Sequence, residues 1–316
     1  MNDYLVNEYN KPTEERNFGL WYPPEGMKPV CRGGPDAVAE VMAADEKKNT
    51  VLWPYLFEAF DDWTYGQQGT GDCVSWEWAH KLDVLTAVQI CLKNLPFEAR
   101  GRIASEAVYG FGRVEIFGRP DYGGPGMNGG YAAQGVAKYG TLHRLNYADV
   151  GHDLSEYSGS RAIKYGRTGV PDVLEPIAAE HKPSDGVQVT DSTMAGALLQ
   201  QGYPVGYCGR TRWGFTRDDD GLAVSKGSGA HGMCITGVRY KNREPFAFWV
   251  ANTGHGNHCS GPVGPYAMPD AYAACGSWMP VKYCERVFSA GDCYAHSYYE
   301  GFPAQELPDW GSYEYL

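Results

Sequence analysis

The stretch Gln67-Gln68-Gly69-Thr70-Gly71-Asp72-Cys73-Val74-Ser75-Trp76 holds a thiol in a setting that favours nucleophilic chemistry. Asp72 is a residue type preferred at helix N-caps, so it predicts Cys73 at the first position of a helix. The free backbone N–H groups and the dipole at that position favour thiolate over thiol. The alternative is a buried thiol without chemistry, because cysteine is among the most buried residue types.

Several helices and strands must position this cysteine. The hydrophobic pattern predicts helices over 35–44, from Cys73 to about residue 94, after a cap at Ser105, over 131–139, and from the 191–192 cap to 199. Strands with alternating apolar residues are expected at 204–208, 233–238 and 246–251, and residues 141–188 are expected to be irregular. Helices before strands indicate an α+β or two-lobed fold rather than a βαβ repeat.

Between about residues 67 and 256, the chain resembles the papain-like (C1) cysteine peptidases. Five motifs carry the resemblance, in the order in which that family has them. They are the glutamine and glycine turn before Cys73, Asn128-Gly129-Gly130-Tyr131 with the helix after it, the helix 194–201 followed by Pro204-Val205, the strand 230–238 that begins with His231, and the strand 248–254 that contains Asn252.

The resemblance implies a two-lobed fold, with the cysteine helix in a helical lobe and the histidine and asparagine in a β-rich lobe. Acyl transfer from an amide needs a nucleophile, a base that later serves as acid, and donors for the oxyanion. The implied roles are Cys73 as nucleophile, His231 as base and acid, and Asn252 as the residue that orients the imidazole ring. Gln67 would donate its side-chain amide to the oxyanion, and Gln68 is the competing choice.

The residue types alone leave other interpretations open. His231 could be a core histidine with satisfied hydrogen bonds, and Asn252 could be a turn residue at a strand end. For the substrate, the resemblance assigns binding positions to Gly129, Gly130, Tyr131, Ala132 and Gly232, the last three lining a small apolar pocket for the substrate's second residue. The implied function is a cysteine endopeptidase acting on a peptide or protein.

The sequence departs from the family pattern in three places. The family follows its asparagine with Ser-Trp, whereas this chain has Thr253-Gly254. Asp72 directly precedes the cysteine, and its carboxylate would oppose a thiolate unless it is used as the helix cap. Residues 1–59 also lack the charged helical pattern of the family's inhibitory propeptide, so we do not expect them to be a removable prosegment.

Both ends of the chain differ in composition from the middle. The expected division is an N-terminal extension at 1–59, a papain-like domain at 60–258 and a Tyr/Gly-rich C-terminal extension at 259–316. Because tyrosine and tryptophan are favoured at interfaces, both extensions are expected to reach from the body toward neighbouring chains of an assembly. The chain is also similar to papain-fold proteins of tailed bacteriophages, and the alternative function is therefore a structural component of a virion.

Composition excludes several other classes of function. The formal charge of −11 and the pI near 5.2 speak against a nucleic-acid partner. No stretch approaches the roughly 18 apolar residues of a membrane span, and the start of the chain has no signal-peptide pattern, so synthesis in the cytoplasm is expected. No cofactor is expected. The candidates for a metal site, which fit no common ligand pattern, are 255–259, 218–221 and the cysteines at 275, 284 and 293.

Overall fold

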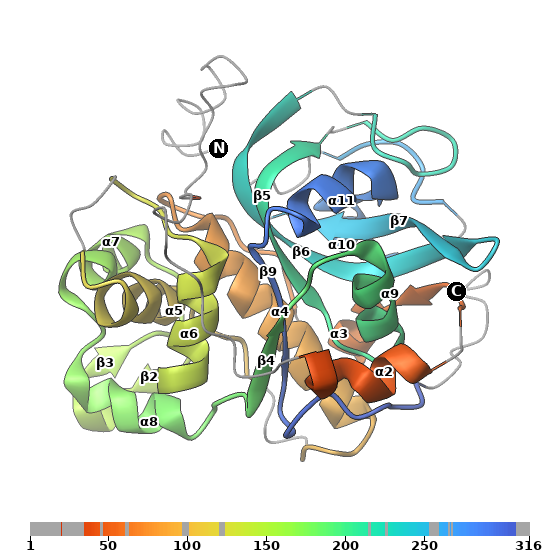
Figure 1. Cartoon of the computed structure of the whole chain (residues 1–316). Helices are drawn as coiled ribbons and strands as arrows, with labels where there is room; N and C mark the ends of the chain where they lie inside the picture. The colour runs from red at the N-terminus through yellow and green to blue at the C-terminus, as the bar shows by residue number, and fades with distance from the viewer. Residues whose placement is uncertain are drawn as a thin grey trace.

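The computed structural model describes residues 20, 35–44, 47–60, 63–96, 101–119, 124–213, 216–224, 227–252, 259–264, 266 and 268–307. A helical lobe and a β-rich lobe lie on either side of the long helix α4 (Cys73–Cys91), as Figure 1 shows. The α+β class predicted from the sequence is therefore confirmed.

The β-rich lobe is built on a seven-stranded sheet in which all neighbouring strands are antiparallel. Strand β1 (Thr50–Val51) pairs with β6 outside the main order. The order of the other six is β4 (Asp185–Gln188), β9 (Cys293–Ser297), β5 (Val205–Trp213), β6 (Gly227–Lys241), β7 (Glu244–Ala251) and β8 (Gly276–Pro280).

Helices cover both faces of this sheet. A Cβ atom at Gly206 of β5 would touch Trp78 of α4, whereas one at Gly209 would touch Val287 of α11 (Val281–Phe288). Positions three apart in a strand point to opposite faces, so α4 and α11 lie on opposite sides of β5. Helix α9 (Ser192–Gln200) also packs on β5, β6 and β7, and its N-terminus is capped by Asp191, as predicted.

The helical lobe has a small apolar core of its own, centred on Phe111, Leu142 and Leu174. Its elements include α7 and α8, which fall in the region 141–188 that was expected to be irregular. The sequence gives α7 only a weak signal, because just three of its residues are buried. The elements of the lobe are α5 (Ser105–Gly110), the π-helical turn η4 (Phe111–Ile116), α6 (Gly129–Tyr139), β2 (Asn146–Tyr147), η5 (Ala148–Val150), β3 (His152–Asp153), α7 (Gly159–Thr168), η6 (Asp172–Leu174) and α8 (Glu175–Ala179).

The N-terminal boundary expected at residue 59 is wrong for the described residues. Helices η2 (Pro35–Val38), α2 (Ala39–Ala43) and α3 (Trp53–Ala59) fold onto the body, and Trp53 and Leu56 are fully buried in its core. Leu20 is also buried and forms a parallel β-bridge with Met127. The low apolar content of residues 1–59 did not indicate these buried positions, because a few large apolar side chains are enough to anchor a segment to the core.

The C-terminal boundary expected at residue 258 is wrong for the same reason. Strands β8 and β9 complete the central sheet, and β9 lies between β4 and β5 (Figure 1). Helices α10 (Asp270–Ala273) and α11 pack beside them, and Trp278 and Tyr294 are fully buried. These tyrosines and tryptophans serve the core, which removes the argument that residues 35–59 and 259–307 extend toward other chains.

Candidate active site

Cys73 is the first residue of α4, where the sequence predicts it. Its side chain lies between the two lobes, and its sulfur accepts a hydrogen bond from the backbone N–H of Gly232 at 3.4 Å. Gly232 belongs to β6, and a Cβ atom there would lie 3.0 Å from the Cα of Val74. The absence of a side chain at Gly232 therefore lets the start of α4 approach β6 closely.

The environment of the Cys73 thiol opposes ionisation in this structure. The residue is fully buried, and burial raises the pKa of the thiol well above its usual range. The hydrogen bond from Gly232 acts in the opposite direction, while the nearby Glu77 and Asp72 raise the pKa further. The thiolate expected from the helix N-terminus alone is therefore not the form that this buried geometry favours.

His231 and Asn252 are joined across neighbouring strands. Their Nε2 and Oδ1 atoms lie 2.6 Å apart, and both residues are buried. The backbone N–H of Asn252 donates to Cys275 at 2.7 Å, which fixes the residue just beyond the end of β7. Burial lowers the pKa of His231 to about 4, although the bond to Asn252 favours the charged ring. The imidazole is therefore neutral in this arrangement.

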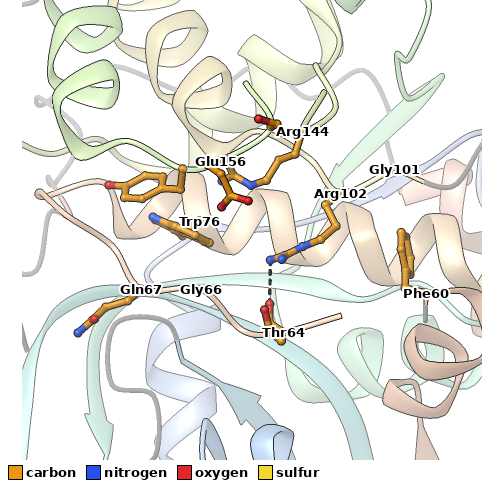
Figure 2. Close-up of a pocket in the computed structure, with 11 residues that line it drawn as sticks. Phe60, Thr64, Gly66, Gln67, Trp76, Gly101, Arg102, Arg144 and Glu156 are labelled. Atoms are coloured by element: carbon orange, nitrogen blue, oxygen red, sulfur yellow. Dashed lines mark hydrogen bonds between the residues drawn. The ribbon is translucent and has the colours of Figure 1, made fainter. Parts of the chain in front are cut away.

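The tandem glutamines are placed differently. The side chain of Gln68 is buried, and its Nε2 donates to the Thr70 carbonyl at 2.8 Å. Gln67 is exposed and lines a pocket together with Trp76 of α4 (Figure 2). Because the Gln68 side chain is buried whereas Gln67 is exposed at a pocket, Gln67 is the better candidate for a donor to substrate.

The first residues of α6 make an inter-lobe contact that the sequence does not predict. Asn128 caps α6 by accepting a hydrogen bond from Tyr131 N. The amides of Gly129 and Gly130 donate at 2.9 and 2.8 Å to the carboxylate of Asp292, which directly precedes β9. These two N–H groups are thus used within the protein.

Two observations limit how the residues that are expected to bind substrate could do so. Substrate contacts of Gly129 and Gly130 would have to come from groups other than their N–H groups. Tyr131, Ala132 and Gly232, also assigned to the substrate, are buried.

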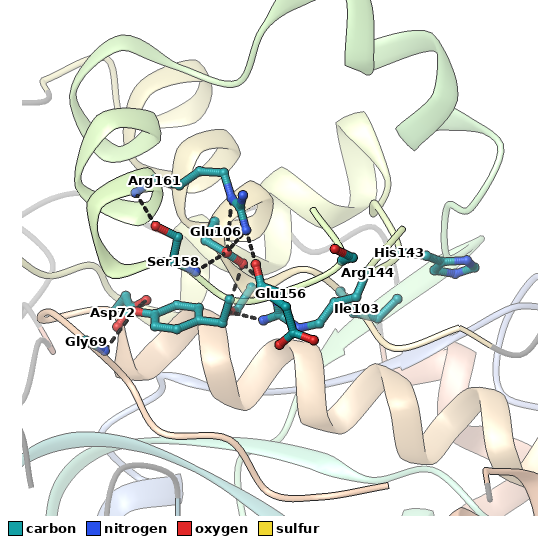
Figure 3. Close-up of polar contacts among 12 residues, drawn as sticks. Gly69, Asp72, Ile103, Glu106, His143, Arg144, Glu156, Ser158 and Arg161 are labelled. Atoms are coloured by element: carbon teal, nitrogen blue, oxygen red, sulfur yellow. Dashed lines mark hydrogen bonds and ion pairs between the residues drawn. The ribbon is translucent and has the colours of Figure 1, made fainter. Parts of the chain in front are cut away.

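Asp72 does not cap α4 with its side chain, contrary to the prediction. Its Oδ2 instead accepts a hydrogen bond from the hydroxyl of Tyr157 at 2.9 Å, and that hydroxyl also accepts from Gly69 N at 2.7 Å (Figure 3). Burial raises the pKa of Asp72 to about 8, with the Tyr157 bond acting in the opposite direction. At neutral pH the carboxyl group next to Cys73 is therefore mostly protonated, so it opposes a thiolate less than its sequence position suggested.

Beside Tyr157, a buried ion cluster ties α5 to the following segments of the helical lobe. The carboxylate of Glu106 is fully buried and pairs with Arg144 at 3.1 Å and Arg161 at 2.9 Å (Figure 3). It also accepts a hydrogen bond from Ser158 N at 2.9 Å. The cluster satisfies the buried charge and fixes the segment that carries Tyr157.

Two parts of the expected site lie outside the described residues. Thr253-Gly254, where the family pattern is broken, falls there, and so do His255 and His258. Among the residues that the structure does describe, no three His, Cys, Asp or Glu side chains gather so that they could bind a metal ion. Within the same residues, no helix combines the length and apolar character needed to cross a bilayer.

The comparisons with known proteins concern the fold. No family model and no curated protein matches the sequence. Among solved structures, the chain is similar to xylellain, a cysteine protease from Xylella fastidiosa, with a TM-score of 0.57 at 15% identity over 91% of this chain and 98% of that one. A procathepsin B from Trypanosoma congolense matches with a TM-score of 0.47 at 11% identity, over 88% of this chain and 85% of that one. At such identities the likeness bears on architecture alone.

Proposed function

The chain has the papain-like fold, and from this premise we propose that it is a cysteine peptidase whose substrate is a peptide or protein. One observation carries the proposal. The sulfur of Cys73 contacts the backbone of Gly232, and the residue before that glycine, His231, is hydrogen-bonded to Asn252. These contacts support a site in which Cys73 of α4 would act as nucleophile, His231 of β6 as base, and Asn252, just after β7, as the residue that orients the ring.

In the proposed reaction, the Cys73 thiolate attacks the carbonyl carbon of the scissile amide. The negative charge that develops on the carbonyl oxygen is stabilised by the Cys73 backbone N–H and the Gln67 side chain. His231 gives its proton to the leaving amine as the C–N bond breaks, which leaves a thioester on Cys73. A water molecule, deprotonated by His231, then hydrolyses the thioester and restores the thiol.

This mechanism requires the site to open. Cys73 and His231 are both inaccessible to solvent, and burial is the largest cause of both pKa shifts. Admission of substrate and water to the cleft would remove much of that burial. The pKa of the Cys73 thiol would then fall and that of the His231 imidazole would rise. Both changes favour an ion pair in which the Cys73 thiolate acts as nucleophile and the His231 imidazolium as acid.

The test is labelling by an epoxide inhibitor of papain-like enzymes, with the modified residue mapped by mass spectrometry. We expect the label on Cys73, and we expect Cys73→Ala or His231→Ala to abolish it. The Cys73→Ala substitution should change the free energy of unfolding by about 1 kcal/mol or less. Cys91 is only partly buried, so Cys91→Ala is a matched control that should keep the label.

Labelling that survives in Cys73→Ala, or that maps to Cys91 or Cys234, would overturn the proposal. The alternative of a virion component has lost its main support, because the described residues of both expected extensions fold onto the body.

A further inference from the structure

A pocket of about 510 Å³ opens beside Gln67, between the segment 64–67 and the helical lobe (Figure 2). Its walls combine aromatic rings with two arginines and one glutamate. The aromatic residues are Phe60, Trp76 and Tyr157, and the charged ones are Arg102, Arg144 and Glu156. An amphipathic cavity with a few charged groups is the usual form of a binding site for a small ligand or a short peptide segment.

Among the residues that the structure describes, Arg102 is a pocket cation that forms no ion pair with a carboxylate. Its Nη2 donates to the Thr64 carbonyl at 2.8 Å, and its guanidinium lies 5.8 Å from the Trp63 ring. Within the described part of the chain, it forms no ion pair. Burial raises the pKa of Asp83 to about 6, and the Arg102 charge acts in the opposite direction. That carboxylate already accepts hydrogen bonds from Trp63 Nε1 and Ile103 N.

The other charged residues of the pocket differ from Arg102. Arg144 is paired with the buried Glu106, and its side chain is only 8% exposed. Glu156 is exposed, so solvent weakens its influence on a ligand. Within the described lining of the pocket, an entering anionic group would therefore meet the Arg102 guanidinium as the strongest donor outside an ion pair.

The pocket lies on the opposite side of α4 from the loop expected to bind substrate. A Cβ atom at Gly66 would touch the Trp76 ring, whereas one at Gly129 would touch the Trp78 ring. Residues two apart on an α-helix point about 200° apart, so these two rings mark opposite faces. If the acyl part of the substrate lies along 129–132, the leaving part extends toward Gln67 and this pocket.

We propose that Arg102 binds a carboxylate of the leaving part of the substrate. This inference rests on the proposed peptidase function and specifies its substrate class. The carboxylate is either the C-terminus of the substrate or an acidic side chain one or two residues after the scissile bond. In both cases the planar guanidinium offers paired N–H donors to the carboxylate.

The experiment compares cleavage of matched peptides by the full chain. The two peptides of the first pair have the same sequence, which ends two residues after the cleaved bond. One has a free C-terminal carboxylate and the other a C-terminal amide. A second pair is longer, amidated, and has Glu or Gln at the second leaving position. We expect kcat/KM to be about tenfold higher for the acid of at least one pair. The pair that shows the difference identifies the source of the carboxylate.

Three variants localise the effect. Arg102→Gln should remove the preference for the acid, so that kcat/KM for the acid falls about tenfold relative to that for the amide or Gln peptide. Arg167→Gln removes the same charge from an exposed position outside this pocket, so the preference should persist. Glu156→Gln removes the opposing carboxylate and should increase the preference by about twofold.

A binding measurement separates this inference from the proposed function. In the Cys73→Ala chain, titration calorimetry with a dipeptide acid and its amide should show about tenfold tighter binding of the acid, and Arg102→Gln should abolish the difference. If Cys73 is labelled and peptides are cleaved, but acid and amide behave alike in both assays, the carboxylate site is refuted and the peptidase stands. If the acid binds through Arg102 but no peptide is cleaved, the peptidase fails and the site is one for carboxylates only.

Discussion

The Nε2 of His231 in β6 and the Oδ1 of Asn252, the residue after β7, lie 2.6 Å apart. The pairing of β6 with β7 brings the two residues near each other, because Cys234 of β6 pairs with Ala251, the last residue of β7. The bond uses Nε2, so the proposed proton exchange with the Cys73 sulfur would use Nδ1. In the proposed mechanism, Asn252 would be a positioning residue that acts through the imidazole.

Replacement of Asn252 tests this arrangement. Asn252→Ala should lower kcat by about 10²-fold with little change in KM, because a misplaced imidazole transfers protons poorly while substrate contacts persist. Asn252→Gln keeps the amide but displaces it, so it should not restore activity. Peptide cleavage measured under steady-state conditions gives both constants. A wild-type kcat in Asn252→Ala would show that the asparagine is only a strand-end residue.

A second prediction concerns Asp72 and pH. Its pKa is raised from 3.8 to about 8 in the folded chain, so the folded state keeps a proton that the unfolded state loses near pH 4. Its contribution to stability is fully present below pH 4 and is lost as pH rises through about 8. Asp72→Asn cannot ionise, and its Oδ1 can still accept from Tyr157. The variant should therefore gain about 2–4 kcal/mol relative to wild type between pH 4 and pH 8.

Urea unfolding at pH 4 and pH 8 measures this difference, since the slopes of both proteins should be alike. Other titrating groups are common to both chains and cancel in the comparison. Parallel stability curves for the two proteins across this range would contradict a protonated Asp72.

A third prediction concerns the link between the lobes at Asp292. Asp292→Ala leaves the amides of Gly129 and Gly130 buried without an acceptor, which should cost about 2–4 kcal/mol in the free energy of unfolding. Asp219 is exposed on a turn, and Asp219→Ala should change stability by about 0.5 kcal/mol or less. Chemical denaturation of both variants provides the measurement. Equal stabilities would show that the carboxylate does not hold the lobes together.

A fourth prediction concerns Leu20. This buried residue pairs with Met127, directly before the Asn128 loop that flanks the closed site. A charge at position 20 would be costly to bury, so Leu20→Asp should detach the residue from the loop and speed epoxide labelling of Cys73. Met42 is 40% exposed, and Met42→Asp is the control for an added charge. If wild type, Leu20→Asp and Met42→Asp are labelled at the same rate, the Leu20 contact does not control access of the epoxide to Cys73.

Local patterns were sufficient to predict several of these elements. The start of α4 at Cys73, the cap of α9 at Asp191 and the presence of strands at β5, β6 and β7 all depend on residues close in sequence. The resemblance also brought His231 and Asn252 into one site, although their catalytic roles stay a prediction. What local patterns could not show is which side chain satisfies which backbone group.

Asp292 illustrates that limit, because it binds amides 162 and 163 residues away and stands in no recognisable motif. Asp72 is a second case. Its sequence context indicates a helix cap, but Tyr157, 85 residues away, supplies the hydrogen bond instead. The two wrong domain boundaries have a related cause, since average composition does not show that β1, β8 and β9 have partners in a distant sheet.

The place of β9 within the sheet also determines when the molecule can be completed during synthesis. Its residues, 293–297, are translated long after those of β4 and β5, yet they must lie between these two strands. Until they leave the ribosome, β4 has no neighbour in the sheet, and the Asp292 carboxylate cannot yet reach α6. Domains whose contacts span such long sequence separations fold slowly. A nascent chain would therefore hold the cysteine helix before the sheet beside it and the Asp292 link to α6 are complete.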